Sequence, residues 1–205
     1  MNGRAYEAAK RALDLLVGVL GIVVTSPFLL ATAIAIKLES RGPVIFRQER
    51  VGRHGRPFQI LKFRTMVEGA HLIGPGFLTS HGDPRITRVG GFLRRWSLDE
   101  LPQLFNILRG DMSVIGPRPT LRYQVAQYTD FQRRRLEVLP GVTGWAQIRG
   151  RNGLTWPERI ELDVWYVDHR SFAVDLRILL KTLAVISRPD EVYNEQRADW
   201  GERKR

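Results

Sequence analysis

The chain has 205 residues, with 32 lysines and arginines against 21 aspartates and glutamates, and a formal net charge of +11. Its length suits one domain, and its apolar (43%) and charged (26%) fractions exclude a wholly disordered, collagen-like or coiled-coil chain. Because it has no cysteine, disulfide scaffolds, thiolate metal sites and cysteine nucleophiles are excluded, whereas the positive excess predicts anionic partners: nucleic acid, anionic lipid or a phosphorylated substrate.

An uncharged apolar segment covers residues 15–36. As a helix it would be about 33 Å long, enough for a hydrocarbon core of about 30 Å. Ser26-Pro27 lies near its middle, where Pro27 has no N–H for the Val23 carbonyl and the Ser26 hydroxyl is a local replacement donor. The segment is too long, and too apolar after Pro27, for a cleaved signal peptide.

Both flanks of this segment are basic, which bears on its topology. A helix that spans a membrane is expected to carry more lysine and arginine at its cytoplasmic end. Similar charge at both ends favours a re-entrant segment that enters one leaflet and returns at Pro27, while a plain spanning helix stays an alternative. The basic residues are Arg4, Lys10 and Arg11 before the segment and Lys37 and Arg41 after it.

Two β-like runs and a loop follow the apolar segment. Residues 44–46 and 58–63 are separated by a turn-rich stretch, which predicts a β hairpin. Residues 68–91 are rich in glycine with weak periodicity and are predicted to form a loop. A helix is then expected over 98–108, ending at Gly110.

The second half of the chain is predicted to be mostly helical. Residues 122–138 have helical apolar spacing, whereas the glycine-rich residues 139–153 are predicted to form a loop. Thr155 and Glu158 match a capping box that opens a helix to about Asp168. Residues 172–186 form a further helix, for which core packing and an interfacial position on lipid are both open. The fold class is therefore a small, mostly helical α/β domain joined to a membrane segment.

Asp99 and Glu100 are adjacent carboxylates at a predicted helix start. Ser97 and Glu100 match a capping box, and from spacing alone capping is the favoured interpretation. A helix start also favours anions, and only there can adjacent carboxylates face one site. The alternative is therefore a functional pair, in which the helix start keeps Asp99 ionised with a low pKa.

Candidate cations lie in two other places. Lys62 and Arg64 end the second predicted strand, and Arg118 lies between Pro117 and Pro119. Flanking prolines stiffen the backbone that presents a guanidinium suited to phosphate. The arginine runs at 133–135 and 149–151 are more typical of a solvated face than of nucleic-acid contacts. The histidines show no metal-ligand spacing.

Together these segments resemble the bacterial sugar transferase family, the monotopic phosphoglycosyl transferases. The matching stretches occur in family order across nearly the whole chain. They are Ser26-Pro27, VIFRQERVGRHGRPFQILKFRTM (44–66), RRWSLDELPQLFNILRGDMSVIGPRP (94–119), LPGVTGWAQIRGRNG (139–153) and ELDVWYV (161–167).

The resemblance implies transfer of a sugar-1-phosphate from a UDP-sugar to a polyprenol phosphate, such as undecaprenyl phosphate, with release of UMP. It implies that Asp99 attacks the β-phosphorus and touches Mg²⁺, and that Glu100 supports proton transfer or orientation. Lys62, Arg94 and Arg118 take the positions of phosphate-binding cations. The implied location is the cytoplasmic face of the bacterial inner membrane, where a monotopic anchor meets lipid.

The domain division that follows has three parts: a re-entrant membrane helix over 1–41, a cytoplasmic catalytic domain over 42–193 and a polar tail over 194–205. No nucleic acid is expected as a partner. The competing hypothesis is a membrane-anchored basic module that binds anionic lipid or nucleic acid without catalysis. Neither the UDP-sugar, the glycoconjugate pathway nor the oligomeric state follows from the sequence.

Overall fold

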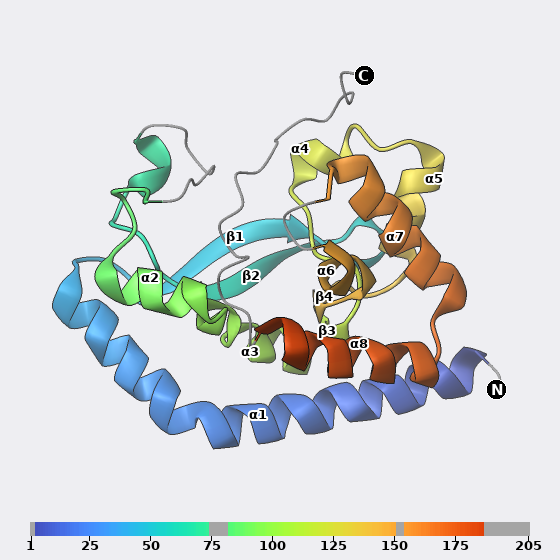
Figure 1. Cartoon of the computed structure of the whole chain (residues 1–205), viewed down its shortest axis with the longest axis horizontal. Coiled ribbons are helices and arrows are strands. Elements are labelled where there is room, and N and C mark those ends of the chain that lie inside the picture. The colour runs from blue at the N-terminus through green and yellow to red at the C-terminus, as the bar shows by residue number, and fades with distance from the viewer. Residues whose placement is uncertain (1–2, 74–81, 151–153, 187–205) are drawn as a thin grey trace.

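One long helix runs along a whole side of the molecule in the computed structural model, which describes residues 3–73, 82–150 and 154–186 (Figure 1). In this helix, α1 (Gly3–Glu39), residues Ala5–Glu39 are long and apolar enough to cross a membrane. Many of its apolar side chains lie on the surface, with Leu16 55% and Val24 75% exposed. Since large exposed apolar surfaces mark interaction sites, α1 presents a face suited to lipid.

The middle of α1 is bent rather than broken (Figure 1). The helix continues through Pro27, which has no N–H for the Val23 carbonyl. The Ser26 hydroxyl donates to that carbonyl at 2.8 Å, as the sequence predicted, and the Thr25 hydroxyl donates to the Gly21 carbonyl at 2.6 Å. The freed backbone acceptor is therefore satisfied locally, which a bend at membrane depth requires.

The first turns of α1 are fastened to the C-terminal helices through one buried carboxylate. Asp175 accepts hydrogen bonds from the Tyr6 hydroxyl at 2.9 Å, from Lys10 Nζ at 2.8 Å and from the Tyr166 hydroxyl at 2.8 Å. Asp175 is 5% exposed, so its contacts with three donors offset its desolvation.

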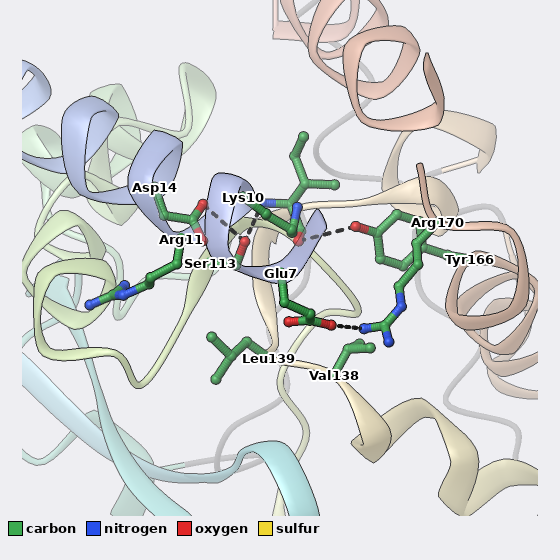
Figure 2. A pocket seen from close by; sticks show the side chains of 10 residues that line it. Glu7, Lys10, Arg11, Asp14, Ser113, Val138, Leu139, Tyr166 and Arg170 are labelled. Carbon is green, nitrogen blue, oxygen red and sulfur yellow. Dashed lines mark hydrogen bonds and ion pairs between the residues drawn. The ribbon is translucent and has the colours of Figure 1, made fainter. Parts of the chain in front are cut away.

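Further polar contacts line the same end of α1, as Figure 2 shows. Asp14, 3% exposed, accepts from the Ser113 hydroxyl at 3.0 Å and from the Val114 N–H at 2.9 Å. Glu7 forms an ion pair with Arg170 (Figure 2). The N-terminal half of α1 is thus held by polar contacts as well as by apolar packing.

The C-terminal end of α1 is held by the same globular part. Glu39 accepts hydrogen bonds from the Arg88 and Val89 N–H groups, at 2.7 and 3.0 Å, at the start of α2 (Arg88–Arg95). The Arg64 guanidinium donates to the Ser40 carbonyl and hydroxyl, at 2.9 and 3.0 Å, and to the carbonyl of the following residue. Both ends of α1 are therefore attached to one body.

The predicted hairpin is present. Strands β1 (Ile45–Val51) and β2 (Pro57–Phe63) pair antiparallel across a short 3₁₀ turn, η1 (Arg53–Gly55). β1 is longer than predicted. Its second half alternates exposed polar residues with partly buried ones, so it contains no continuous apolar run by which a strand could be predicted.

The loop predicted over 68–91 contains helical turns at both ends of its described part. A 3₁₀ turn, η2 (Ala70–Leu72), lies near its start, and α2 begins within it at Arg88. The Thr87 hydroxyl caps α2 by accepting from the Gly90 N–H at 2.9 Å. Gly90 also lets α2 approach the preceding segment, because a Cβ there would lie 2.0 Å from the Thr65 carbonyl oxygen.

The predicted helix over 98–108 is divided. A 3₁₀ turn, η3 (Leu98–Glu100), precedes α3 (Gln103–Arg109). As predicted, the helix ends at Gly110, where φ is 86°. Ile60 of β2, Ile107 of α3 and Met112 form one buried cluster, so α3 lies beneath the hairpin.

Two predictions for the second half are wrong. Residues 122–138 form three short pieces: α4 (Arg122–Val125), α5 (Asp130–Arg133) and η4 (Arg134–Glu137). The helix is interrupted because Thr129 caps a new start, its hydroxyl accepting from the Gln132 N–H at 3.3 Å.

The predicted loop over 139–153 contains regular structure in its described part. Strand β4 (Gly141–Thr143) pairs in parallel with β3 (Ser113–Ile115), and α6 (Trp145–Gly150) follows. The glycine that suggested a loop serves close packing instead, because a Cβ on Gly141 would lie 2.0 Å from the Gly116 nitrogen.

The last two helices match their predicted positions. The Thr155–Glu158 capping box opens α7 (Trp156–His169), and α8 is Phe172–Ile186. One face of α8 is buried at Ile178, while Leu180 and Leu183 are 61% and 69% exposed. Core packing is confirmed for one face of this helix, and the interfacial position on lipid stays a prediction for its outward apolar face. The polar tail over 194–205 lies outside the described residues.

Candidate active site

The carboxylate pair sits on an unusual turn. Ser97 has φ 55°, a left-handed conformation uncommon for a residue with a side chain, and Asp99 and Glu100 follow in the 3₁₀ turn η3. The capping box predicted between Ser97 and Glu100 is absent, since no side-chain cap bond forms at Ser97. Pro102, next to the start of α3, needs no donor there. The turn therefore presents both carboxylates as side-chain acceptors.

Glu100 is held by two of the predicted cations. Lys62 Nζ donates to Glu100 Oε1 at 2.6 Å, and Arg118 Nη2 donates to the same oxygen at 2.7 Å. Burial by itself raises the pKa of Glu100, but Arg118 and Lys62 outweigh it and hold the pKa well below its usual range. Glu100 is therefore ionised at neutral pH and fixes both cations beside its neighbour.

Asp99 differs from Glu100 in its contacts. It is partly exposed and, within the described part of the chain, makes no hydrogen bond or ion pair. Burial raises its pKa and the Glu100 charge raises it further, while Lys62, Arg94 and Arg118 act in the opposite direction. The net direction is upward, so the low pKa predicted from the helix start is wrong. The carboxylate is more basic than an ordinary aspartate and is not engaged by another side chain.

Arg94 reaches the site from the last turn of α2. Its Nε donates to the Thr65 hydroxyl at 2.8 Å, and its charge acts on Asp99. Thr65 is 6% exposed and belongs to the LKFRTM stretch, but hydroxyl residues on strand ends carry no signal that distinguishes this role. The close approach of α2 at Gly90 is what brings the two side chains together.

Arg118 is presented by the predicted proline-flanked loop. Arg135 holds the backbone of that loop. Its Nη2 donates to the Arg118 carbonyl at 2.9 Å and pairs with Asp163. Arg135 is 2% exposed, so the prediction of a solvated face for residues 133–135 is wrong at this position. The sequence alone does not show that an arginine inside a basic run is buried, because its partner, Asp163, comes from α7.

Arg64 does not join the other cations. Its guanidinium contacts the backbone at the end of α1, away from the carboxylate pair. The structure thus brings together Asp99, Glu100, Lys62, Arg94 and Arg118, and separates Arg64 from them. Ser26 and Pro27, the predicted membrane break, lie at the bend of α1.

The donor set suits a hard divalent cation. Mg²⁺ is commonly held by one or two carboxylates plus substrate phosphates, retaining several waters. Asp99 supplies a carboxylate with no competing side-chain partner among the described residues, so the residues present fit such an ion bound together with a phosphorylated ligand. No group of three or more histidine, cysteine, aspartate or glutamate side chains gathers in the described residues.

The arrangement can act on phosphate. A carboxylate without a partner can serve as a nucleophile, and the surrounding cations can stabilise charge on a phosphoryl group. The paired Glu100 is chemically different from Asp99 although the two are neighbours, because its two cations hold its charge.

Comparison with known proteins gives the family. The model of the bacterial sugar transferase family matches residues 5–189. The sugar transferase EpsL of Bacillus subtilis is 47% identical over 174 residues, which make up 85% of this chain and 85% of that protein. The UDP-glucose:undecaprenyl-phosphate glucose-1-phosphate transferase of Caulobacter vibrioides is 44% identical over 199 residues, covering 92% of this chain and 73% of that protein.

Other relatives are longer than the shared region. The UDP-N-acetylgalactosamine-undecaprenyl-phosphate N-acetylgalactosaminephosphotransferase of Aeromonas hydrophila is 44% identical over 187 residues, which cover 88% of this chain but 44% of that protein. The residues that match the family model include the carboxylate pair and its three cations. The chain belongs to the bacterial sugar transferase family.

Proposed function

We propose that this chain transfers a sugar-1-phosphate from a UDP-sugar to undecaprenyl phosphate and releases UMP. The names of the Caulobacter and Aeromonas relatives support the substrate classes. The observation that carries the proposal is the contrast within the carboxylate pair: Asp99 has no side-chain partner among the described residues, while Glu100 holds Lys62 and Arg118 beside it.

The chemistry proceeds in two displacements. An Asp99 oxygen attacks the β-phosphorus of the donor, a new O–P bond forms, and the bond to the UMP oxygen breaks with its electron pair leaving on UMP. A phosphate oxygen of the acceptor then attacks the same phosphorus and releases the Asp99 carboxylate. Splitting the transfer in this way replaces one difficult step by two easier ones.

Each neighbouring side chain has a distinct task in this scheme. Lys62, Arg94 and Arg118 bind the phosphate oxygens and reduce repulsion between the diphosphate and Asp99. Glu100 orients Lys62 and Arg118, and its lowered pKa argues against proton donation near neutral pH. The raised pKa of Asp99 makes its carboxylate a better nucleophile once it is ionised. Mg²⁺, held by Asp99 and substrate phosphates, would supply further neutralisation of the diphosphate charge.

We infer that α1 enters one leaflet and returns, so that the protein is monotopic on the cytoplasmic face of the bacterial inner membrane. The support is mechanical: Tyr6, Lys10 and Asp14 fasten one end of α1 to the globular part, and Glu39 fastens the other. A straight helix with ends on opposite sides of a bilayer could not keep both sets of contacts. The exposed apolar residues of α8 would lie at the same surface.

Cysteine labelling tests this topology directly, because the chain has no cysteine of its own. Single cysteines at Ala5 and at Arg47 are both expected to react with a membrane-impermeant maleimide only from the cytoplasmic side of inverted vesicles. The control is the same pair in detergent, where both should react. Labelling from opposite sides would establish a spanning helix and overturn the inference.

The transfer itself is tested by measuring UMP release from a panel of UDP-sugars with the chain in nanodiscs. Multiple-turnover release is expected for at least one sugar and only when undecaprenyl phosphate is present. The competing hypothesis of a basic module that binds anionic lipid without catalysis predicts no release for any sugar, and such a result would remove the enzymatic proposal.

A further inference from the structure

Arg50, the second-last residue of β1, is a cation that the predicted site did not include. Its Nη2 donates to Gln48 Oε1 at 2.6 Å, and its Nη1 donates to the Pro119 carbonyl at 3.3 Å. The Nε–H is buried and has no hydrogen-bond partner among the described residues. Pro119 follows Arg118 in the chain, and the charge of Arg118 acts on Arg50.

Two adjacent guanidinium groups repel each other unless an anion lies between them. The charge of Glu100 acts on Arg50, but Glu100 already accepts hydrogen bonds from Lys62 and Arg118. Burial, and then repulsion from Arg118, lowers the pKa of Arg50 to about 10, so the group stays charged at neutral pH. A partly buried, charged side chain with a buried, unpaired donor atom is costly in the free protein and suits the arrival of an anion.

The contacts of Arg50 and Arg118 set the direction in which Arg50 extends the site. Asp99 is acted on by Lys62, Arg94 and Arg118, whereas Arg50 is acted on by Arg118, Glu100 and Tyr123. Arg118 is common to both sets and is 40% exposed, so a ligand can reach it from solvent. Lys62 and Arg118 both contact Glu100, the neighbour of Asp99, and Arg50 contacts the carbonyl of Pro119, next to Arg118. The cations therefore form a row that runs from the carboxylate pair past Arg118 to Arg50.

We propose that Arg50 and Arg118 bind the phosphate that leaves with the nucleoside, while the sugar-bearing phosphate lies at Asp99. This inference rests on the proposed function, since it divides the two phosphates of a UDP-sugar between the two ends of that row. The phosphate next to the nucleoside carries the negative charge that develops on UMP when the O–P bond breaks. A guanidinium placed there stabilises that leaving group.

A purely structural role for Arg50 predicts something different. In that role the side chain only braces the Pro119 carbonyl and thereby the loop that presents Arg118. Lysine would keep the positive charge of Arg50 but lose the forked geometry that reaches Gln48 and Pro119 together. The Arg50→Lys substitution therefore distinguishes a charge contact with the ligand from structural support of the Pro119 carbonyl.

The test is the affinity of the full chain for UMP, measured by isothermal titration in detergent. The Arg50→Gln variant is expected to raise the Kd about 10- to 100-fold, the usual effect of losing a hydrogen bond to a charged group. Arg50→Lys is expected to recover most of the affinity. The matched control is Arg47→Gln on the exposed side of the same strand, which changes the net charge equally and should leave the Kd unchanged.

Unchanged UMP affinity in Arg50→Gln would overturn the proposal, and so would an Arg50→Lys variant as weak as Arg50→Gln, which would identify a brace. The titration involves no transfer step. Failure of the wild-type chain to transfer sugar phosphate would therefore count against the proposed function, while the UMP titrations would still decide the role of Arg50.

Discussion

Replacing Asp99 with asparagine is expected to lower UMP release by at least about a thousandfold, because removal of a nucleophile commonly costs that much or more. Asparagine keeps the size of the side chain but cannot form the acyl phosphate. The measurement is steady-state UMP release with a UDP-sugar and undecaprenyl phosphate. The same assay on Glu49→Gln, which neutralises an exposed carboxylate on β1, should give the wild-type rate.

The same Asp99→Asn substitution is expected to leave the folded protein as stable as before or more so. Burial raises the pKa of Asp99 above its unfolded value, so the ionised carboxylate destabilises the fold at any pH above the ordinary aspartate range. Asparagine removes that charge, and at pH 7 the melting temperature should therefore stay level or rise. Near-normal turnover in a well-folded Asp99→Asn protein would show that the covalent role is wrong.

The largest expected effect on stability comes from Asp163→Asn. Asp163 and Arg135 form an ion pair in which both side chains are 1% exposed. Burial alone would lower the pKa of Arg135, but Asp163 and Tyr128 raise it above its usual range, so Arg135 is charged. Removing one partner of such a pair costs about 3–5 kcal/mol, because the other charge stays buried without compensation. For a chain of this size the melting temperature should fall by about 10 °C.

Asp168→Asn on the same helix is the matched control. Asp168 pairs with Arg134, the neighbour of Arg135, but these side chains are 40% and 38% exposed. An exposed pair contributes at most about 1 kcal/mol, so the melting temperature should change by no more than a few degrees. Equal effects of the two substitutions, measured by thermal unfolding, would contradict the larger contribution assigned to the buried Arg135–Asp163 pair.

Features set by neighbouring residues could be read from the sequence. The Thr155–Glu158 capping box and the helix end at Gly110 each depend on a few consecutive positions, and the structure has both. The role of Ser26 beside Pro27 was also predictable, because the carbonyl that proline frees lies one turn away.

Features that depend on residues far apart in the chain could not be read from the sequence. The Ser97–Glu100 pattern predicts a capping box, but Lys62 and Arg118 bind Glu100 more strongly than a backbone N–H could, since both are cations. The raised pKa of Asp99 likewise depends on its burial in the folded chain, which a helix-start argument omits. Arg135 looked like part of a solvated run because its partner, Asp163, comes from another helix.

The central claim, that Asp99 carries the sugar phosphate, is tested most directly by mass spectrometry of the quenched enzyme. The chain is incubated with its UDP-sugar in the absence of undecaprenyl phosphate, quenched, digested and analysed. The account predicts a sugar-phosphate mass increment on the peptide containing Asp99, which disappears when acceptor is added before the quench. Transfer that proceeds at the full rate with no adduct at any time, and with product formed only when donor and acceptor are bound together, would contradict it.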